Sequence, residues 1–405
     1  MKGLPVIVFG LLFLQSCEKF SLNNIYRSDV LWGRNQGRDS LSGRDHTLKS
    51  DTTVCVSAVI VPEDYDWRRD TAYGAVACEV QLLKNGVRQF SARAGADEPI
   101  SISPSTHHIF GGHLYTERAT ASGTIICRDG ELCFSYPERE LLKGLLIKNG
   151  IVHTVGGALD GSGFNYRRNG EIVISQENAL VFGDFVNPAY GRSGAIYEND
   201  GAVCFCFRNS STCYTVRDGE MLAMRPSIRA ARVRDMRLIG SECYYVADFT
   251  TSMFVFSPSR TYTLPTGISW QTASVFSRDG IPWIMADSPT KTICRPLEQA
   301  EKEDAGMQFS GNGNFVYPGG SRVYSVSCDG SIISLRDDNG ELLFIRDSTF
   351  FFGPLCAQCT GDQMYMLVNP REREETPFIW QGDKEIPCDL NGYLTGIEVE
   401  ISPPR

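Results

Sequence analysis

The chain has 405 residues and a formal net charge of −9 at pH 7, with 42% hydrophobic and 21% charged residues. This composition is that of an ordinary globular protein and excludes a disordered chain or a long coiled coil. The acidic balance argues against nucleic acid as the main partner, because phosphate binding requires a basic surface.

The first seventeen residues have the pattern of a targeting signal. Lys2 supplies a positive charge, and the apolar run from Leu4 to Leu14 is too short to cross a bilayer as a helix. The run ends in Leu14-Gln15-Ser16-Cys17, which resembles a bacterial lipoprotein signal. In proteins with that signal the chain is cut before the cysteine, whose thiol then carries lipid. A plain secretory signal with an incidental cysteine is the alternative.

This resemblance implies a signal peptide at residues 1–17, lipidation of Cys17 and an acyl anchor in the lipid bilayer of the outer membrane. The chain would then reside in the cell envelope, on either the periplasmic or the outer face. Residues 18–50 follow as a predicted flexible tether, because they are rich in Ser, Asn, Gly, Arg and Asp and show no hydrophobic periodicity.

The chain contains 14 cysteines, so an odd number remains when Cys17 is set aside. Several lie inside apolar runs that read as strands, for example Cys204 and Cys206, and the pattern favours buried free thiols over a disulfide framework. The pair Cys356-Ala-Gln-Cys359 lies between strand-like runs, where neither a redox motif nor a zinc site is expected.

From residue 51 onward a tight turn of the Asn-Gly or Asp-Gly type returns every 40 to 50 residues or so. Such turns are the strongest short signal for a β-hairpin, because both central residues must adopt positive φ. The turns are Lys84-Asn85-Gly86, Arg128-Asp129-Gly130-Glu131, Arg168-Asn169-Gly170-Glu171, Arg217-Asp218-Gly219-Glu220 and Asp338-Asn339-Gly340-Glu341, with weaker members near Ser259, Pro296 and Gly382.

A second glycine turn precedes an apolar alternating run in each unit, as at Asn149-Gly150 before Ile151. Two turns and four strands in a period of about 42 residues predict an all-β fold, a β-propeller, over residues 51–405. The unit Phe164-Asn165-Tyr166-Arg167-Arg168-Asn169-Gly170 is similar to the aromatic-x-Lys/Arg-Asn-Gly repeats of uncharacterised lipoproteins from Bacteroides-type bacteria. That resemblance covers most of residues 51–390 and implies a cell-envelope β-propeller, without indicating an activity.

The unit at residues 51–91 lacks an obvious first strand, whereas Tyr393 to Ile401 is an alternating strand with no unit of its own. The C-terminal strand is therefore expected to complete the first blade and close the ring, which removes the exposed sheet edges. This gives eight four-stranded blades; seven blades with an extra hairpin are the alternative.

Ligands of propellers commonly bind at the mouth of the central channel, so long loops and channel-facing strands supply the candidate binding residues. The longest loop, residues 62–74, offers aromatic rings that could stack on a sugar and carboxylates of the kind that glycoside hydrolysis uses. A surface loop with mutually paired charges is the alternative. The candidate residues of this loop are Asp64, Tyr65, Asp66, Trp67, Arg68, Arg69, Asp70 and Tyr73.

His107 and His108 fall on the predicted innermost strand of the second unit, so one is expected to face the channel and the other the sheet packing. Their spacing to the other histidines matches no metal motif, and neither a metal nor a cofactor is expected. Arg232 and Arg234 share one face of the fifth unit's innermost strand, where they could hold a carboxylate or sulfate or pair with nearby acidic residues. Arg192 lies in a connection long enough to overhang the same mouth.

The sequence contains no Walker A motif, no GxGxxG after a strand, no GxSxG, no HExxH and no EF-hand loop. The leading prediction is a non-catalytic binding or scaffold propeller for a glycan, a peptide or a partner protein. The alternatives are a glycoside hydrolase or polysaccharide lyase with its site at the channel mouth, and a purely structural envelope component.

Overall fold

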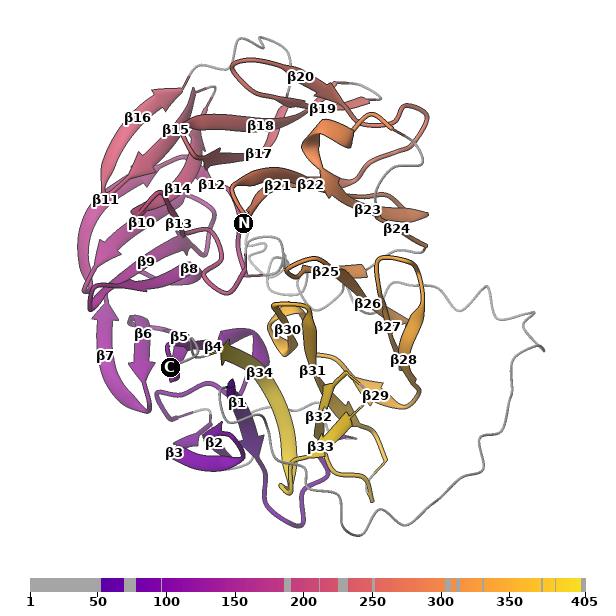
Figure 1. Ribbon diagram of the computed structural model, residues 1–405. Helices are drawn as coiled ribbons and strands as arrows, with labels where there is room; N and C mark the ends of the chain where they lie inside the picture. The colour runs from indigo at the N-terminus through magenta and orange to yellow at the C-terminus, as the bar shows by residue number, and fades with distance from the viewer. Residues whose placement is uncertain are drawn as a thin grey trace, which may run out of the picture. The chain divides into compact units, whose positions relative to one another are not determined.

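The computed structural model describes residues 52–68, 78–95, 97–185, 191–210, 212–224, 232–249, 252–302, 307–310, 314–329, 331–372, 374–382 and 384–401 (Figure 1). Residues 47–405 form one compact unit. The predicted signal peptide with Cys17 and nearly all of the predicted tether lie outside the described residues. Among the described residues, three short 3-10 helices lie between strands: η1 (Pro104–Thr106), η3 (Leu297–Gln299) and η4 (Pro354–Cys356). In the described part of the chain, no helix has the length and hydropathy needed to span a bilayer.

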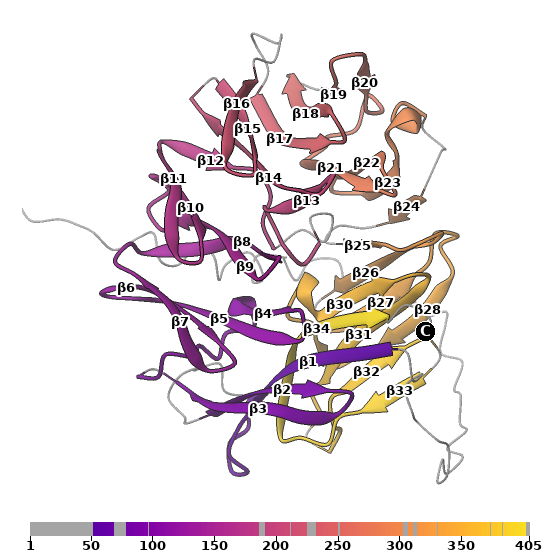
Figure 2. The same cartoon turned by 60° about the vertical axis from the view of Figure 1, so that its left-hand side comes forward.

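Eight antiparallel sheets follow one another around a central channel in chain order, and each sheet is one blade of a β-propeller (Figures 1 and 2). Each blade runs from its innermost to its outermost strand. Blade 1 has β34 (Gly392–Ile401), β1 (Thr52–Ile60), β2 (Cys78–Lys84) and β3 (Val87–Ala94); blade 2 has β4 (His107–Phe110), β5 (His113–Thr120), β6 (Gly123–Arg128) and β7 (Glu131–Tyr136). Blade 3 has β8 (Glu140–Lys148), β9 (Ile151–Ala158), β10 (Gly163–Arg168) and β11 (Glu171–Glu177); blade 4 has β12 (Ala179–Val181) with β13 (Tyr197–Asn199), then β14 (Ala202–Asn209), β15 (Thr212–Arg217) and β16 (Glu220–Met224).

The second half of the chain repeats this arrangement. Blade 5 has β17 (Arg232–Ile239), β18 (Glu242–Phe249), β19 (Ser252–Phe256) and β20 (Thr261–Thr263); blade 6 has β21 (Thr272–Arg278), β22 (Ile281–Asp287), β23 (Lys291–Pro296) and β24 (Met307–Ser310). Blade 7 has β25 (Asn314–Pro318), β26 (Val323–Asp329), β27 (Ile332–Arg336) and β28 (Leu342–Arg346); blade 8 has β29 (Thr349–Phe350) with β30 (Ala357–Thr360), then β31 (Gln363–Pro370), β32 (Phe378–Gln381) and β33 (Lys384–Pro387).

The last strand closes the ring, as predicted. β34 pairs antiparallel with β1 along its whole length, from Thr52 opposite Ile401 to Ile60 opposite Gly392, and Figure 2 shows the two strands side by side. Asn369 of blade 8 joins the closing strand to its other neighbour, because its side chain donates to the Leu394 carbonyl and accepts from the Leu394 amide. The prediction of eight blades is therefore confirmed, and the alternative of seven is wrong.

The Asn and Asp residues of the repeated turns are needed for a hydrogen bond as well as for their positive φ angles. Asn169 adopts a φ of 47° between β10 and β11, and its side-chain oxygen accepts a hydrogen bond from the Val152 amide of β9 at 2.9 Å. Asn85, Asp129 and Asp218 make the same contact in their own blades. A short side chain with an oxygen acceptor that tolerates positive φ is therefore needed at this position, which explains the recurrence of Asn and Asp.

The glycine that follows also serves the packing between blades. Gly130 has a φ of 78°, and a Cβ there would come within 2.6 Å of the Phe90 ring on the outermost strand of the preceding blade. At Gly170 a Cβ would meet Phe134 in the same way. The two turn residues thus connect the hairpin of one blade to the outer strand of its neighbour.

The core consists of eight clusters of buried apolar side chains, one between each pair of neighbouring blades. This follows from the strand periodicity, because each sheet buries both faces against its neighbours. The weak turn predicted near Pro296 is wrong. Pro296 ends β23, and η3 and a longer connection precede β24.

Two innermost strands are interrupted. β12 and β13 both pair with β14, at opposite ends, and β29 and β30 pair with β31 in the same manner. The chain leaves the sheet between the two halves of each strand. The described parts of the blade 4 segment are 182–185 and 191–196, and the blade 8 segment is 351–356. Blades 4 and 8 are four positions apart in a ring of eight, so the two segments enter the channel from opposite sides.

Candidate functional site

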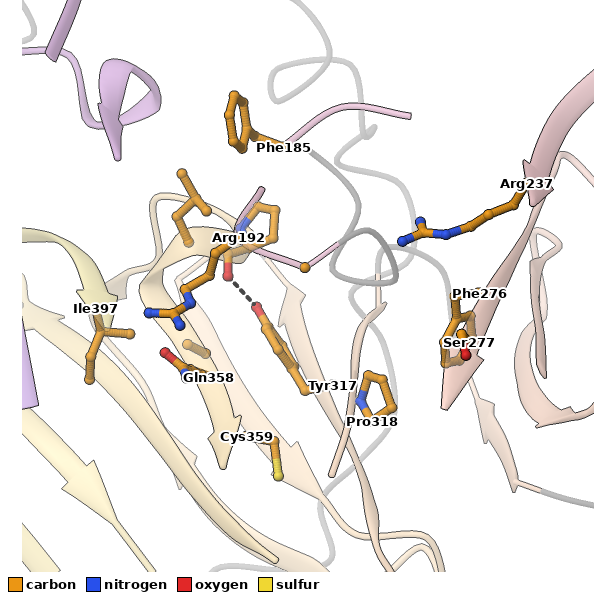
Figure 3. A pocket seen from close by; sticks show the side chains of 14 residues that line it. Phe185, Arg192, Arg237, Phe276, Ser277, Tyr317, Pro318, Gln358, Cys359 and Ile397 are labelled. Atoms are coloured by element: carbon orange, nitrogen blue, oxygen red, sulfur yellow. Dashed lines mark hydrogen bonds between the residues drawn. The ribbon is translucent and has the colours of Figure 1, made fainter. Parts of the chain in front are cut away.

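The channel contains a cavity of about 320 Å³, which we call the channel cavity (Figure 3). It is bordered by innermost strands of blades 5, 6, 7, 8 and 1 and by the two segments that interrupt blades 4 and 8. Its lining residues are Phe185, Gly191, Arg192, Arg237, Phe276, Ser277, Tyr317, Pro318, Pro354, Leu355, Ala357, Gln358, Cys359 and Ile397. A volume of this size is at the lower end of the range for small-molecule sites.

Arg192 is held in place by a buried carboxylate. It forms an ion pair with Glu398 on β34, whose side chain is only 1% exposed. Glu398 also accepts hydrogen bonds from the amides of Gly111 at 2.9 Å and Gly112 at 2.7 Å, in the turn between β4 and β5. One carboxylate therefore ties together blade 1, blade 2 and the blade 4 segment. Figure 3 shows Arg192 next to Gln358 and Ile397.

Arg237 borders the cavity from the other side. It projects from β17 toward the middle of the cavity (Figure 3), and its guanidinium lies 4.0 Å from the centre of the Tyr197 ring. Stacking on an aromatic face fixes the plane of a guanidinium. Arg237 is buried, so this orientation is maintained without solvent around its stem.

The prediction for Arg232 and Arg234 is corrected by a bulge in β17. The pairing with β18 shifts register between Val233 and Asp235, so Arg234 is an extra residue and Arg237 falls on the face of Arg232. Arg232 and Arg234 are exposed and do not line the channel cavity. Arg234 forms an ion pair with Asp248 at 2.5 Å, which is the alternative that the sequence left open.

His107 and His108 are both buried. His107 is a structural residue, since its ring contacts the Thr395 hydroxyl at 2.9 Å and the Ser101 carbonyl at 2.6 Å. Burial lowers the pKa of His107 to about 4 and the pKa of His108 to about 3, so both rings are neutral near pH 7. His108 stacks on Phe185, with ring centres 4.1 Å apart, and neither of its nitrogens has a hydrogen-bond partner.

The described half of the 62–74 loop is a structural clasp. Trp67 is 3% exposed and packs between Phe350 of blade 8 and Tyr393 of blade 1, with ring centres 5.5 and 5.1 Å away. Arg68 donates to the Pro370 carbonyl at 3.1 Å and lies over the Trp67 ring. The prediction that Trp67 stacks on a sugar is wrong, because its ring is buried across the closure of the propeller.

The other candidate residues of this loop are either at least partly exposed to solvent or lie outside the described residues. Asp64 is exposed, and Tyr65 and Asp66 are half-buried. Arg69, Asp70 and Tyr73 lie outside the described residues. The described part of the loop contributes no residue to the channel cavity, so the structure does not bring these candidates together with Arg192.

The thiols and the phenol near the cavity have raised pKa values, so they stay protonated and are poor nucleophiles. Burial raises the pKa of Cys359 to about 12 and that of Cys356 to about 12, and it raises the pKa of Tyr317 well above its ordinary value. The Tyr317 hydroxyl donates to the Pro354 carbonyl at 3.1 Å. All 13 cysteines of the described residues are free, which confirms the prediction of unpaired thiols, and nine of them are buried.

Sequence reasoning missed Phe185, Gln358 and Glu398 and did not choose Arg237 as a candidate. Gln358 bonds through both ends of its amide to the Val399 backbone, at 2.9 Å each, and thereby fixes blade 8 to blade 1. The only available signal was the length of the connection around Arg192. In the described residues, no group of three or more His, Cys, Asp or Glu side chains is arranged to hold a metal ion.

The chain matches no protein-family model, and no curated protein matches it in sequence. Among solved structures it is similar to a dihydro-heme d1 dehydrogenase, NirN, with 10% identity over 84% of this chain and 74% of that chain and a TM-score of 0.48. It is also similar to Hsv2p of Kluyveromyces lactis, with 10% identity, 79% and 94% coverage and a TM-score of 0.36. A puromycin-hydrolyzing peptidase of Mycobacterium tuberculosis gives 10% identity, 71% and 52% coverage and a TM-score of 0.40. Likenesses of this size carry no argument about function.

Proposed function

We propose that this chain is a non-catalytic binding protein of the cell envelope that holds its ligand in the channel cavity. The observation that carries the proposal is the composition of the lining. Most of the lining residues are apolar, and the polar ones include Arg192 and Arg237, which border the space from different sides. An apolar concavity with a small number of placed polar groups is the usual form of a small-molecule binding site.

The same lining offers little for acid–base catalysis. Its titratable described residues are Arg192, Arg237, Tyr317 and Cys359. A general acid or base works best with a pKa near the ambient pH. The pKa values of Tyr317 and Cys359 are raised away from that range, and arginine stays protonated. A binding role therefore accounts for the site more simply than the alternative of a glycoside hydrolase or polysaccharide lyase.

The envelope location in this proposal depends on Cys17 and the apolar run before it, which resemble a lipoprotein signal. Acylation at Cys17 would attach the propeller to the outer membrane through the tether at residues 18–50. Metabolic labelling with palmitate followed by membrane fractionation tests this part. We expect label and membrane association in the parent chain and neither in Cys17→Ser. Labelling that persists in Cys17→Ser would refute the anchor.

The binding role is tested with the full chain in detergent, screened by thermal shift against a mixed library of neutral, cationic and anionic compounds and against a glycan array. In parallel, polysaccharides are incubated with the protein and checked for released products. We expect binding without product, and loss of that binding in Ser277→Trp, where a large ring enters from the exposed edge of the cavity. Product release would favour the enzyme, and silence in every assay would favour a structural component.

A further inference from the structure

The sequence contains six Asn-Gly pairs, and five of them lie in the described part of the chain. Asparagine is a thermolabile residue, and a glycine after it leaves the next backbone nitrogen unhindered because glycine has no Cβ. That nitrogen can attack the asparagine side chain and expel its amide. The described pairs are Asn85-Gly86, Asn149-Gly150, Asn169-Gly170, Asn339-Gly340 and Asn391-Gly392, whereas Asn312-Gly313 lies outside the described residues.

Two of these pairs form the outer turns of blades 1 and 3 and are held by two hydrogen bonds each. The side-chain oxygen of Asn85 accepts from the Val54 amide at 2.8 Å, and the Asn85 amide donates to the Val54 carbonyl at 2.8 Å. Asn169 is held by Val152 in the same two ways. The carbonyl carbon of each side chain is therefore fixed against the neighbouring strand, away from the nitrogen that would attack it.

Two further pairs are restrained through their amide groups. The side chain of Asn339 donates to the Asp337 carboxylate at 3.4 Å, and the Gly340 amide donates to the Asp337 carbonyl at 3.0 Å. The side chain of Asn391 donates to the Val61 carbonyl at 3.0 Å. In these pairs the leaving group or the attacking nitrogen is already engaged in a hydrogen bond.

Asn149 has none of these restraints. It lies in the two-residue turn between β8 and β9, and both Asn149 and Gly150 are exposed. Within the described residues, neither the Asn149 side chain nor the backbone amides of Asn149 and Gly150 form a hydrogen bond. A Cβ at Gly150 would have no atom within 4 Å, so water and hydroxide reach this turn freely.

The fold accepts an aspartate at this position. The equivalent turns of blades 4 and 6 carry Asp200 and Asp279, each followed by glycine, with φ angles of 48° and 52°. Asn149 has nearly the same φ, 51°. An isoaspartate would instead add a backbone atom to the turn and oppose the register in which Lys148 faces Ile151.

We propose that Asn149 is a site of spontaneous deamidation and the most reactive of the five described Asn-Gly pairs in the folded protein. The Gly150 nitrogen attacks the side-chain carbonyl carbon of Asn149. The new C–N bond closes a succinimide ring, and the side-chain amide leaves as ammonia with the proton of the Gly150 amide. Water then opens the ring at either carbonyl and gives aspartate or isoaspartate. The conversion consumes water, releases ammonia, adds a negative charge and does not depend on a ligand in the channel cavity.

Ageing of the full chain in detergent, in neutral and in mildly alkaline buffer, followed by digestion in acid and peptide mass spectrometry, tests the ranking. Each pair is followed in its own peptide, so Asn312 does not affect the comparison. Asn85 is the matched control, because Lys84-Asn85-Gly86-Val87 and Lys148-Asn149-Gly150-Ile151 differ only in the last residue. We expect conversion at Asn149 to be at least roughly tenfold faster than at Asn85, because two hydrogen bonds must first open at Asn85.

Unfolding in urea separates the fold from the local sequence. Asn85 and Asn149 should convert at equal rates in the unfolded chain. Equal rates in the folded protein, or no conversion at Asn149 while the unfolded chain converts, would overturn the proposal. A difference that persists in urea would also overturn it, because the local sequence would then set the rates. Asn149→Asp should unfold at the urea midpoint of the parent, and a lower midpoint would refute the claim that the turn accepts the product.

Discussion

Replacement of Glu398 with alanine tests whether one carboxylate joins three parts of the ring. The substitution removes the partner of Arg192 and the acceptor of two backbone amides. Breaking a buried ion pair by removing one partner costs about 3 to 5 kcal/mol. Gly111 and Gly112 are not fully buried and the Arg192 side chain is 32% exposed, so water partly replaces the lost acceptor and partly solvates the remaining charge, and we expect a loss below this range, about 2 kcal/mol.

The assay is urea unfolding of the parent, Glu398→Ala and Glu400→Ala, followed by tryptophan fluorescence. Glu400 is the matched control, because it lies two residues further along β34 and is exposed. It should change the unfolding free energy by no more than about 0.5 kcal/mol. If Glu398→Ala destabilises no more than Glu400→Ala, the carboxylate does not hold the ring together. A double-mutant cycle with Arg192→Ala then isolates the ion pair from the amide contacts.

Three further predictions concern the turns, the clasp and a buried acid. Asn169→Ala should destabilise by about 1 to 2 kcal/mol in urea unfolding, because alanine at a φ of 47° is strained and has no acceptor, whereas the exposed Glu171→Ala should be neutral. Trp67→Ala should cost about 3 to 5 kcal/mol; a cost as small as that of the exposed Asp64→Ala would contradict the burial of this ring. Burial raises the pKa of Glu117 from 4.5 to about 7, so between these pH values the folded state binds more protons than the unfolded state. The free energy of unfolding therefore falls as the pH rises through this interval. Glu117→Gln should reduce that fall by up to about 3 kcal/mol, and an unchanged dependence of the unfolding free energy on pH would disprove the prediction.

The architecture was predictable because its signals are local and repeated. In blades 1 to 4 an Asn-Gly or Asp-Gly pair adopts positive φ at both residues, as at Asn169-Gly170, so a signal of two residues marks the outer hairpin of each of these blades. The closing strand was predictable by counting strands, because the unit at residues 51–91 lacked one strand and the strand at Tyr393 to Ile401 belonged to no unit of its own. The turn expected near Pro296 failed because blade 6 makes that connection through η3 instead of a tight hairpin.

The site was less accessible to sequence reasoning. Glu398 and Glu400 occupy equivalent positions in an alternating strand, yet one is buried at a junction of three segments and the other is exposed. Strand alternation also misassigned the arginines of β17, since a bulge at Arg234 changes which side chains share a face. Tertiary contacts decide which glutamate is buried and which arginines share a face, and these contacts cannot be read from the pattern of apolar and polar residues.

The pairing of β34 with β1 also determines when the ring can close during synthesis, because the two strands lie far apart in the chain. Ser57 and Thr395, whose hydroxyls contact each other across this seam, are 338 residues apart in the chain. A growing polypeptide emerges from its N-terminus, so β1 waits with one edge unsatisfied until the final strand is available. A product truncated before residue 392 has seven complete blades but only three strands of blade 1, so it cannot close the ring, and it would expose the unpaired edge of β1 to proteases and to other unfinished chains.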